Sequence, residues 1–110
     1  MDDQRPMAAR QLNDDLRCRH IGGRIVVTRG VQGRGDAFVA ACLEAVARFE
    51  AFDTGNDPHG EHDFGALTVA GERLFFKVDA YVRSLGTASP DPADPTVTVR
   101  VLTIMLASEY

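Results

Sequence analysis

The sequence predicts an α+β fold, a small antiparallel sheet of about three strands packed with helices in the order α-β-α-β-β-α. Three patterns indicate this fold. An apolar stripe with helical spacing runs through residues 37–52, two alternating segments flank a short turn at 70–72, and residues 24–29 are rich in β-branched side chains. Helices and a small sheet of this kind bury their apolar faces against each other.

The length and composition are those of one globular domain. The chain has 110 residues, of which 45% are hydrophobic and 25% charged. We expect a single domain over residues 1–110, with residues 1–6 loosely held. No apolar run is long enough for a membrane span, and the first residues lack the apolar segment of a secretory signal. With Cys18 and Cys42 expected as reduced, buried or half-buried thiols, these features favour a cytoplasmic protein.

The charges are unevenly distributed along the chain. Residues 1–36 carry seven Arg and five Asp, whereas residues 37–110 carry five basic and eleven acidic residues, which gives the net charge of −4. We interpret Arg10, Arg17 and Arg24 as parts of a solvated basic surface. An acidic chain is a poor candidate for direct nucleic-acid binding, so we do not expect it here.

The first half predicts two helices around one strand. Residues 7–20 form a helical pattern with a thin apolar stripe, which Gly22-Gly23 ends. The segment 24–29 is apolar on both faces, which indicates a central position in the sheet. The helix over 37–52, with Asp36 as its N-cap, has an apolar arc wide enough to predict nearly full burial against the sheet.

The second half predicts a hairpin and then an ambiguous segment. Residues 64–69 and 73–83 alternate around the Ala70-Gly71-Glu72 turn, with Leu74, Phe76, Val78, Ala80 and Val82 toward the core. The segment 96–110 has the β-branched alternation of a strand. It also has an Asp94-Pro95 start and an apolar run that is long for a strand, and on these grounds we predict a helix.

The stretch from Phe52 to Gly65 contains two of the three histidines and a run of carboxylates without any Lys or Arg. The candidate binding residues are Asp57, His59, Glu61, His62 and Asp63 in this stretch, and Lys77, Asp79 and Tyr81 on the second hairpin strand. If the two groups converge, they form a polar cleft in which pKa values can shift. The interpretation we favour for Lys77 and Asp79 is a cross-strand ion pair that contributes little to stability.

Two alternatives use the same stretch differently. Imidazole and carboxylate groups are ligands for zinc, manganese and iron, so His59, Glu61, His62 and Asp63 define a metal-dependent hydrolase as one alternative. The pairs Asp57-Pro58 and His59-Gly60 are typical of turns, so a purely structural loop is the other. No histidine follows the hairpin, which argues against a ββα metal nuclease. No cofactor is firmly implied.

Several segments carry a resemblance to a known family. They are Asn56–Gly65, Phe76–Asp79 with Tyr81, Ser89–Asp94 leading into Arg100–Leu106, and Thr28–Val31. These segments resemble DUF3768, a family of small proteins of unknown function, found mainly in alphaproteobacteria and often on plasmids and other mobile elements. The resemblance implies no catalytic residues. It implies a mobile-element setting, in which small acidic proteins often bind a host or defence protein, for example as antagonists of restriction or CRISPR machinery.

Our leading hypothesis is therefore a protein-interaction module that acts as an inhibitor or regulator through the acidic surface of residues 50–63, and not an enzyme. The expected partner is a protein, without a membrane or nucleic acid, and a homodimer is compatible with the sequence. The metal-dependent hydrolase, with a divalent metal as cofactor, and the structural loop stay open as alternatives.

Overall fold

The computed structural model describes residues 5–82 and 87–110. Its elements are α1 (Arg5–Arg19), β1 (Gly23–Val27), α2 (Arg29–Gln32), α3 (Asp36–Arg48), β2 (Phe64–Val69), β3 (Glu72–Val82), β4 (Thr98–Leu106) and the 3-10 helix η1 (Ala107–Glu109). The predicted loose segment 1–6 falls mostly outside the described residues, as does the last residue of the strand predicted over 73–83. No helix in the described part of the chain is long and apolar enough to cross a membrane.

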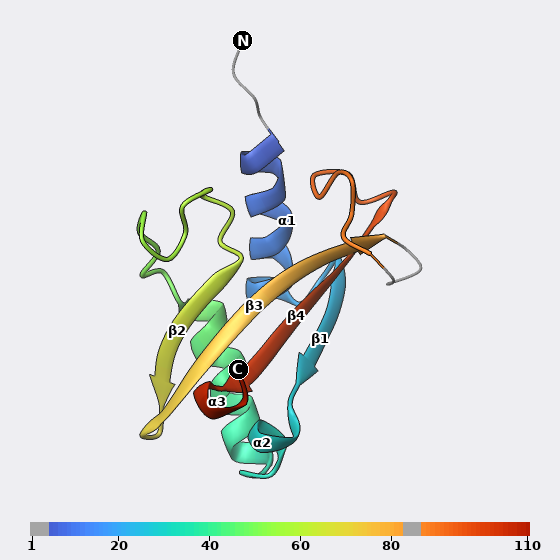
Figure 1. Ribbon diagram of the computed structural model, residues 1–110. Helices are drawn as coiled ribbons and strands as arrows, with labels where there is room; N and C mark the ends of the chain where they lie inside the picture. The colour runs from blue at the N-terminus through green and yellow to red at the C-terminus, as the bar shows by residue number, and fades with distance from the viewer. Residues whose placement is uncertain (1–4, 83–86) are drawn as a thin grey trace.

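One sheet with the strand order β1-β4-β3-β2 forms the centre of the fold (Figure 1). β1 runs parallel to β4, and the other neighbours are antiparallel. The predicted α+β class is confirmed. The sheet is mixed and has four strands, however, because the C-terminal segment adds a strand between β1 and β3.

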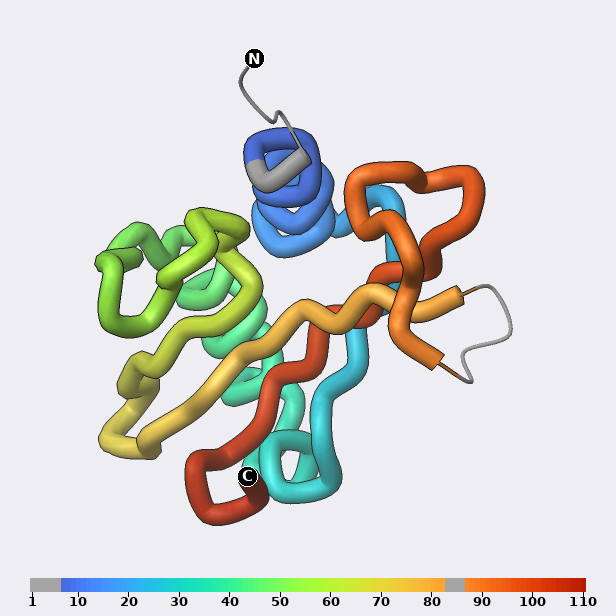
Figure 2. The backbone as a smooth tube through the Cα atoms, turned by 45° about the horizontal axis from the view of Figure 1, so that its top comes forward, coloured from blue at the N-terminus to red at the C-terminus, as the bar shows by residue number. Residues whose placement is uncertain are grey.

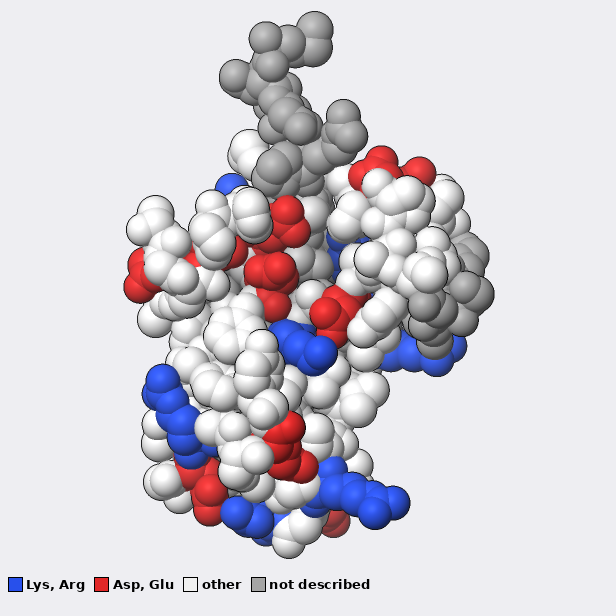
Figure 3. Space-filling model, viewed as in Figure 1, with Lys and Arg blue, Asp and Glu red and all other residues white. Residues whose placement is uncertain are grey.

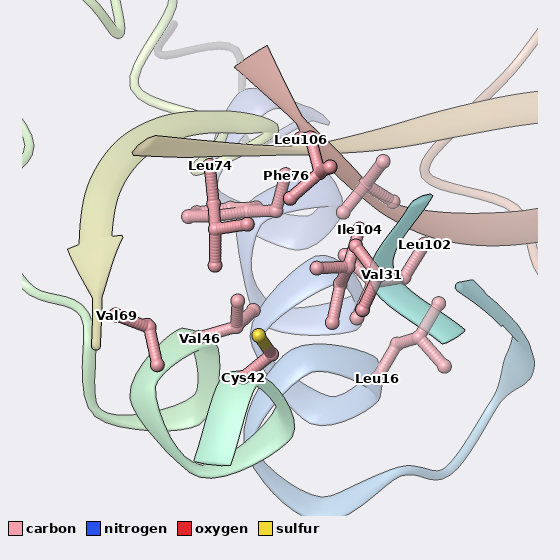
Figure 4. Close-up of a cluster of buried hydrophobic side chains, with 11 residues drawn as sticks. Leu16, Val31, Cys42, Val46, Val69, Leu74, Phe76, Leu102, Ile104 and Leu106 are labelled. Carbon is pink, nitrogen blue, oxygen red and sulfur yellow. The ribbon is translucent and has the colours of Figure 1, made fainter. Parts of the chain in front are cut away.

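Helices α1 and α3 lie on one face of the sheet (Figures 1 and 2). The short 3-10 helix η1 lies at one end of the other face, where Tyr110 packs against Phe64 and Phe75. The core fills the space between the sheet and helices α1 and α3 (Figure 4). Its fully buried side chains are Leu16, Val31, Cys42, Val46, Leu74, Phe76, Leu102 and Ile104. Burying these apolar side chains is the main stabilising contribution to the fold.

The helix predicted over 96–110 is wrong, because this segment forms β4 and η1. β4 has a neighbouring strand on each side, so its apolar run reflects a central strand with apolar residues on both faces. The Asp94-Pro95 start belongs to a turn. The Asp94 carboxylate accepts hydrogen bonds from the N–H and the hydroxyl of Thr96, at 2.9 and 2.6 Å, and its carbonyl accepts one from the N–H of Val97.

The predicted central position of the first strand is also wrong, because β1 is an edge strand. Ile25 and Val27 pack against the core, whereas Val26 is 45% exposed on the opposite face. The apolar residues on both faces of β1 therefore do not mean that both faces are covered.

Helix α3 is shorter and less buried than predicted. It ends at Arg48, and of its residues only Cys42 and Val46 are buried. Gly35 occupies the N-cap position, so Asp36 is the first helical residue and not the cap. Its negative charge there still favours the helix through the dipole.

The predicted hairpin is confirmed. Ala70 and Gly71 both have positive φ angles, of 49° and 81°, as a two-residue hairpin turn of type I′ requires. Leu74, Phe76 and Val78 point into the core as expected. Gly65 pairs with Phe76 across the hairpin, and a side chain at Gly65 would overlap the rings of Phe76 and Phe49.

Candidate functional site

The segment between α3 and β2 is held by its own carboxylates. The Asp53 side chain accepts hydrogen bonds from the N–H groups of Gly55 and Asn56, at 2.8 and 2.9 Å. Asp57, only 7% exposed, accepts them from Glu61 and His62, at 3.0 and 3.1 Å. Such bonds let a polar segment fold back on itself without a strand or helix.

The side chain of His62 lies between the carboxylates of Asp14 and Asp57. Its Nδ1 lies 3.0 and 3.1 Å from the two carboxylate oxygens of Asp14, and its Nε2 lies 3.8 Å from Asp57 Oδ2. An ionised carboxylate only accepts hydrogen bonds, so Nδ1 carries a proton and donates. His62 also has a φ of 55°, which is uncommon for a residue with a side chain. The contacts to Asp57 and Asp14 hold this conformation in place.

Arg17 joins α1 to the end of α3. Its Nη1 donates to the carbonyl oxygens of Val46 and Phe49, both at 2.8 Å, and its Nη2 donates to Asp14 at 2.9 Å. These carbonyls belong to the last turn of a helix, where a cation is favourable. The interpretation of Arg17 as part of a solvated surface is wrong, because the residue is 4% exposed.

These residues border an open groove of about 440 Å³. Its lining residues are Asp14, Arg17, Cys18, Phe49, Glu50, Phe52 and His62.

Cys18 is exposed, contrary to the expectation of a buried or half-buried thiol, and its Sγ lies 3.3 Å from the carbonyl oxygen of Ala47. Burial raises the pKa of the other thiol, Cys42, which keeps it protonated and unreactive.

A second cleft, which we call the acidic cleft, has a volume of about 230 Å³. It is lined by Asn13, Glu61, Asp63, Val78, Asp79, Ala80, Ala88, Ser89 and Pro92. The Asp63 carbonyl accepts a hydrogen bond of 2.8 Å from the N–H of Val78, which fixes the end of the loop beside β3. Figure 3 shows acidic side chains gathered in the upper half of the view. The predicted meeting of the loop with β3 is therefore found at Asp63 and Asp79.

Two of the three carboxylates of the cleft, Glu61 and Asp63, are without an ion-pair partner among the described Lys and Arg residues. Burial, and then the charge of Asp63, raises the pKa of Glu61. Burial raises the pKa of Asp63 as well, and the charges of Asp57 and Asp79 add to this effect. No Lys or Arg of the described residues forms an ion pair with Glu61 or Asp63. The ionised forms of both groups are thus disfavoured in the folded protein.

The side chain of Arg100 holds together segments that line the acidic cleft. It is 2% exposed, and its Nε donates to Asn13 Oδ1 at 2.8 Å, while Nη2 donates to the carbonyl of Pro92. Asn13 in turn donates to the carbonyl of Glu61 at 2.9 Å. Burial lowers the pKa of Arg100, and the charge of Glu61 opposes this change. The buried side chains of Arg100 and Asn13 therefore tie together segments that are far apart in the sequence.

The structure separates the predicted site residues into groups. Glu61, Asp63 and Asp79 line the acidic cleft. Asp57 instead accepts a hydrogen bond from the N–H of His62, and the His62 side chain contacts Asp14. His59 is exposed, Tyr81 is half-buried on β3, and Lys77 pairs with Asp79 at 3.1 Å. This pair lies within β3 and is therefore not the cross-strand ion pair that the sequence favoured. No three His, Cys, Asp or Glu side chains among the described residues are arranged to hold a metal ion.

Sequence reasoning missed Asn13, Asp14 and Arg17 on α1, and Arg100 on β4. A signal for Arg100 was present, because it alternates with Val99 and Val101 and so takes an inward position once the segment is a strand. The α1 residues gave no comparable signal. Their roles depend on which part of the chain packs against this helix.

Fold and site define the protein as a two-layer α+β protein with an acidic cleft beside β3. The chain belongs to the family described as "Protein of unknown function (DUF3768)", whose model matches residues 27–109. Comparisons with curated proteins and with solved structures find no match. The match begins at the last residue of β1, so the contributions of α1 to the groove and the acidic cleft come from outside the matched range.

Proposed function

We propose that this protein is a small protein-interaction module that receives a basic side chain of a partner protein in the acidic cleft. The observation that carries the proposal is the convergence of Glu61, Asp63 and Asp79 on one half-buried cleft. Asp79 has Lys77 as a partner, whereas the other two carboxylates have no described cation within ion-pair distance. A bound ammonium or guanidinium group would remove the repulsion between them.

The size of the acidic cleft favours a side chain over a metabolite. Its volume of about 230 Å³ lies below the roughly 300–1,000 Å³ of typical small-molecule pockets. The end of one Lys or Arg side chain would fit such a space, while its neighbours in the partner would lie on the surrounding surface. Arg is the better candidate, because its planar group can bind two carboxylates at once.

An inhibitory effect on a host or defence protein, in the cytoplasm, completes the proposal. The acidic cleft supports binding, and the inhibitory outcome rests on analogy with small acidic proteins of mobile elements. The free thiols of Cys18 and Cys42 are compatible with a reducing compartment.

A charge-reversal experiment tests the proposal. Wild-type protein and the Glu61→Lys/Asp63→Lys variant would be immobilised and exposed to host cell extract, and the retained proteins identified by mass spectrometry. A Glu44→Lys/Glu72→Lys variant is the matched control, because it changes the net charge equally at two positions outside the acidic cleft. We expect one partner with a basic surface on the wild type and the control, and its loss on the variant.

Titration with a short arginine-rich peptide measures the same interaction directly. We expect binding that weakens with salt and is lost in the Glu61→Lys/Asp63→Lys variant. The proposal is wrong if wild type and variant retain the same proteins and bind the peptide equally.

A further inference from the structure

We infer that the open face of the sheet is the interface of a symmetric homodimer, in which Lys77 and Asp79 of one chain pair with Asp79 and Lys77 of a second copy. This surface is distinct from the acidic cleft, although Asp79 borders both. It consists of the side chains that point away from α1 and α3.

Apolar residues dominate this open face. Side chains alternate along each strand, so the residues that do not face the core share the other side. They include Val26 on β1, Val99 and Val101 on β4, and Phe75 and Tyr81 on β3. Figure 3 looks onto this side of the sheet, and uncharged atoms fill much of the middle of the view. Tyr110 covers Phe75 at one end of this face. The rest of the face has apolar surface to bury on association.

An ion pair lies in the middle of this apolar surface. Lys77 Nζ lies 3.1 Å from Asp79 Oδ2, and the two side chains are 40% and 35% exposed. Across the strand register, Lys77 is opposite Thr103 and Asp79 is opposite Val101. Both charges therefore stand on β3, one of the two central strands, where a partner would cover them.

The arrangement of the two charges identifies a second copy as the occupant. When two such sheets face each other, a two-fold axis can lie between them and pass over β3 near Val78. This axis places Lys77 of each copy opposite Asp79 of the other. Each Lys77 then meets the partner's Asp79, and the four charges alternate in sign. Such self-complementarity is what the isologous interface of a two-fold dimer requires.

The available area fits a weak dimer. Strands of 5 to 11 residues make up the sheet. With about 4.8 Å between strands and about 3.3 Å per residue, the face covers roughly 500 Å². Stable complexes bury about 800 Å² on each partner, so this dimer is at the lower end of specific interfaces and depends on concentration.

Sedimentation equilibrium over a wide range of protein concentration tests the inference. We expect a reversible increase in mass from one chain to two. Lys77→Asp and Asp79→Lys each place four like charges across the two-fold axis, and we expect each variant to be monomeric. The double variant Lys77→Asp/Asp79→Lys restores the alternation, and we expect it to dimerise again.

Val26→Lys is a second variant that leaves the ion pair intact and places a charge on the same face. Its matched control is Met7→Lys, since Met7 is 56% exposed on α1 on the helical side of the sheet. We expect the first to be monomeric and the second to dimerise like the wild type. Circular dichroism of each variant confirms that it is folded. The inference is overturned by a wild type that is monomeric throughout, by a dimer that withstands the single reversals, or by a charge swap that fails to restore the dimer.

Discussion

The imidazole ring of His62 lies flat on the phenyl ring of Phe52, with the ring centroids 3.9 Å apart and the planes inclined by 4°. The guanidinium carbon of Arg17 lies 5.2 Å from the centroid of the same phenyl ring. Phe52 is thus held by two residues that each also bind Asp14. This cluster connects the loop between α3 and β2 to the first helix, and we expect its members to be coupled energetically.

Replacing His62 with Ala should lower the free energy of unfolding by about 2 kcal/mol. The variant loses the contact with Phe52 and the hydrogen bond to Asp14, and alanine tolerates a φ of 55° poorly. Urea denaturation measures the change. His59→Ala is the matched control, because His59 is exposed, and it should change stability by less than about 0.5 kcal/mol. Equal effects at the two histidines would contradict the role given to His62.

Replacing Asp63 with Asn should stabilise the protein at neutral pH. Burial raises the pKa of Asp63 in the folded state, so its contribution to stability is complete below the unfolded pKa and is lost as the pH rises through the folded pKa. We expect a gain of less than about 1 kcal/mol at pH 7, which disappears below about pH 4. Glu61→Gln should behave in the same way. A gain in stability combined with weaker partner binding would be typical of a binding site.

Asp94→Asn is the control for Asp63→Asn, because the two substitutions should change stability at neutral pH in opposite directions. Hydrogen bonds from Thr96 lower the pKa of Asp94, so its contribution is present above the unfolded pKa and is lost as the pH falls through the folded pKa. This variant should therefore be less stable than the wild type at neutral pH. Denaturation curves between acidic and neutral pH distinguish the two cases, and the same sign for Asp63 and Asp94 would contradict the assignment.

Replacing Arg17 with Lys should destabilise the protein by about 3 kcal/mol, although the charge is kept. A lysine cannot bind the carbonyls of Val46 and Phe49 and the carboxylate of Asp14 with one planar group. Arg19→Lys is the control, since the Arg19 side chain is 69% exposed and its pairing with Asp15 is long, at 3.7 Å. Thermal unfolding of both variants tests this, and similar melting temperatures would refute it.

Addition of Zn²⁺, Mn²⁺, Mg²⁺ or Ca²⁺ to chelator-treated protein should leave its melting temperature unchanged. A ligand that binds only the folded state raises this temperature, and the described residues offer no set of three ligands for a metal. A rise that is specific for one metal and absent from the His62→Ala variant would instead support the metal-dependent hydrolase.

Local sequence patterns correctly predicted the elements whose structure is determined by residues close together in the chain. The Ala70-Gly71 turn and the alternation through Leu74 and Phe76 define the hairpin without reference to the rest of the chain. The segment 96–110 was mispredicted because a central strand and a buried helix both give a long apolar run. Its neighbours β1 and β3 decide between the two, and no local pattern reveals them.

The site was predictable to a similar extent. The acidic side of the cleft follows from the composition of the loop and the alternation on β3, which place Asp63 near Asp79. The contributions of Asn13 and Arg17 could not be predicted from the sequence, because these residues reach their partners only through the packing of α1. For Arg17 the sequence predicted contact with water, and only the tertiary structure supplies the carbonyl and carboxylate groups that its Nη atoms bind.

The parallel pairing of β1 with β4 determines when this protein can fold. Gly23 lies beside Arg100 and Val27 beside Ile104, so the first strand gains its neighbour only after the residues of β4 have been made, more than seventy positions later in the chain. β4 also separates β1 from β3, and without it the sheet falls into an isolated strand and a hairpin. Contacts between such distant segments form slowly, because a long loop must close first. Until β4 has been synthesised, the chain that precedes it cannot complete the sheet, and its apolar segments stay exposed.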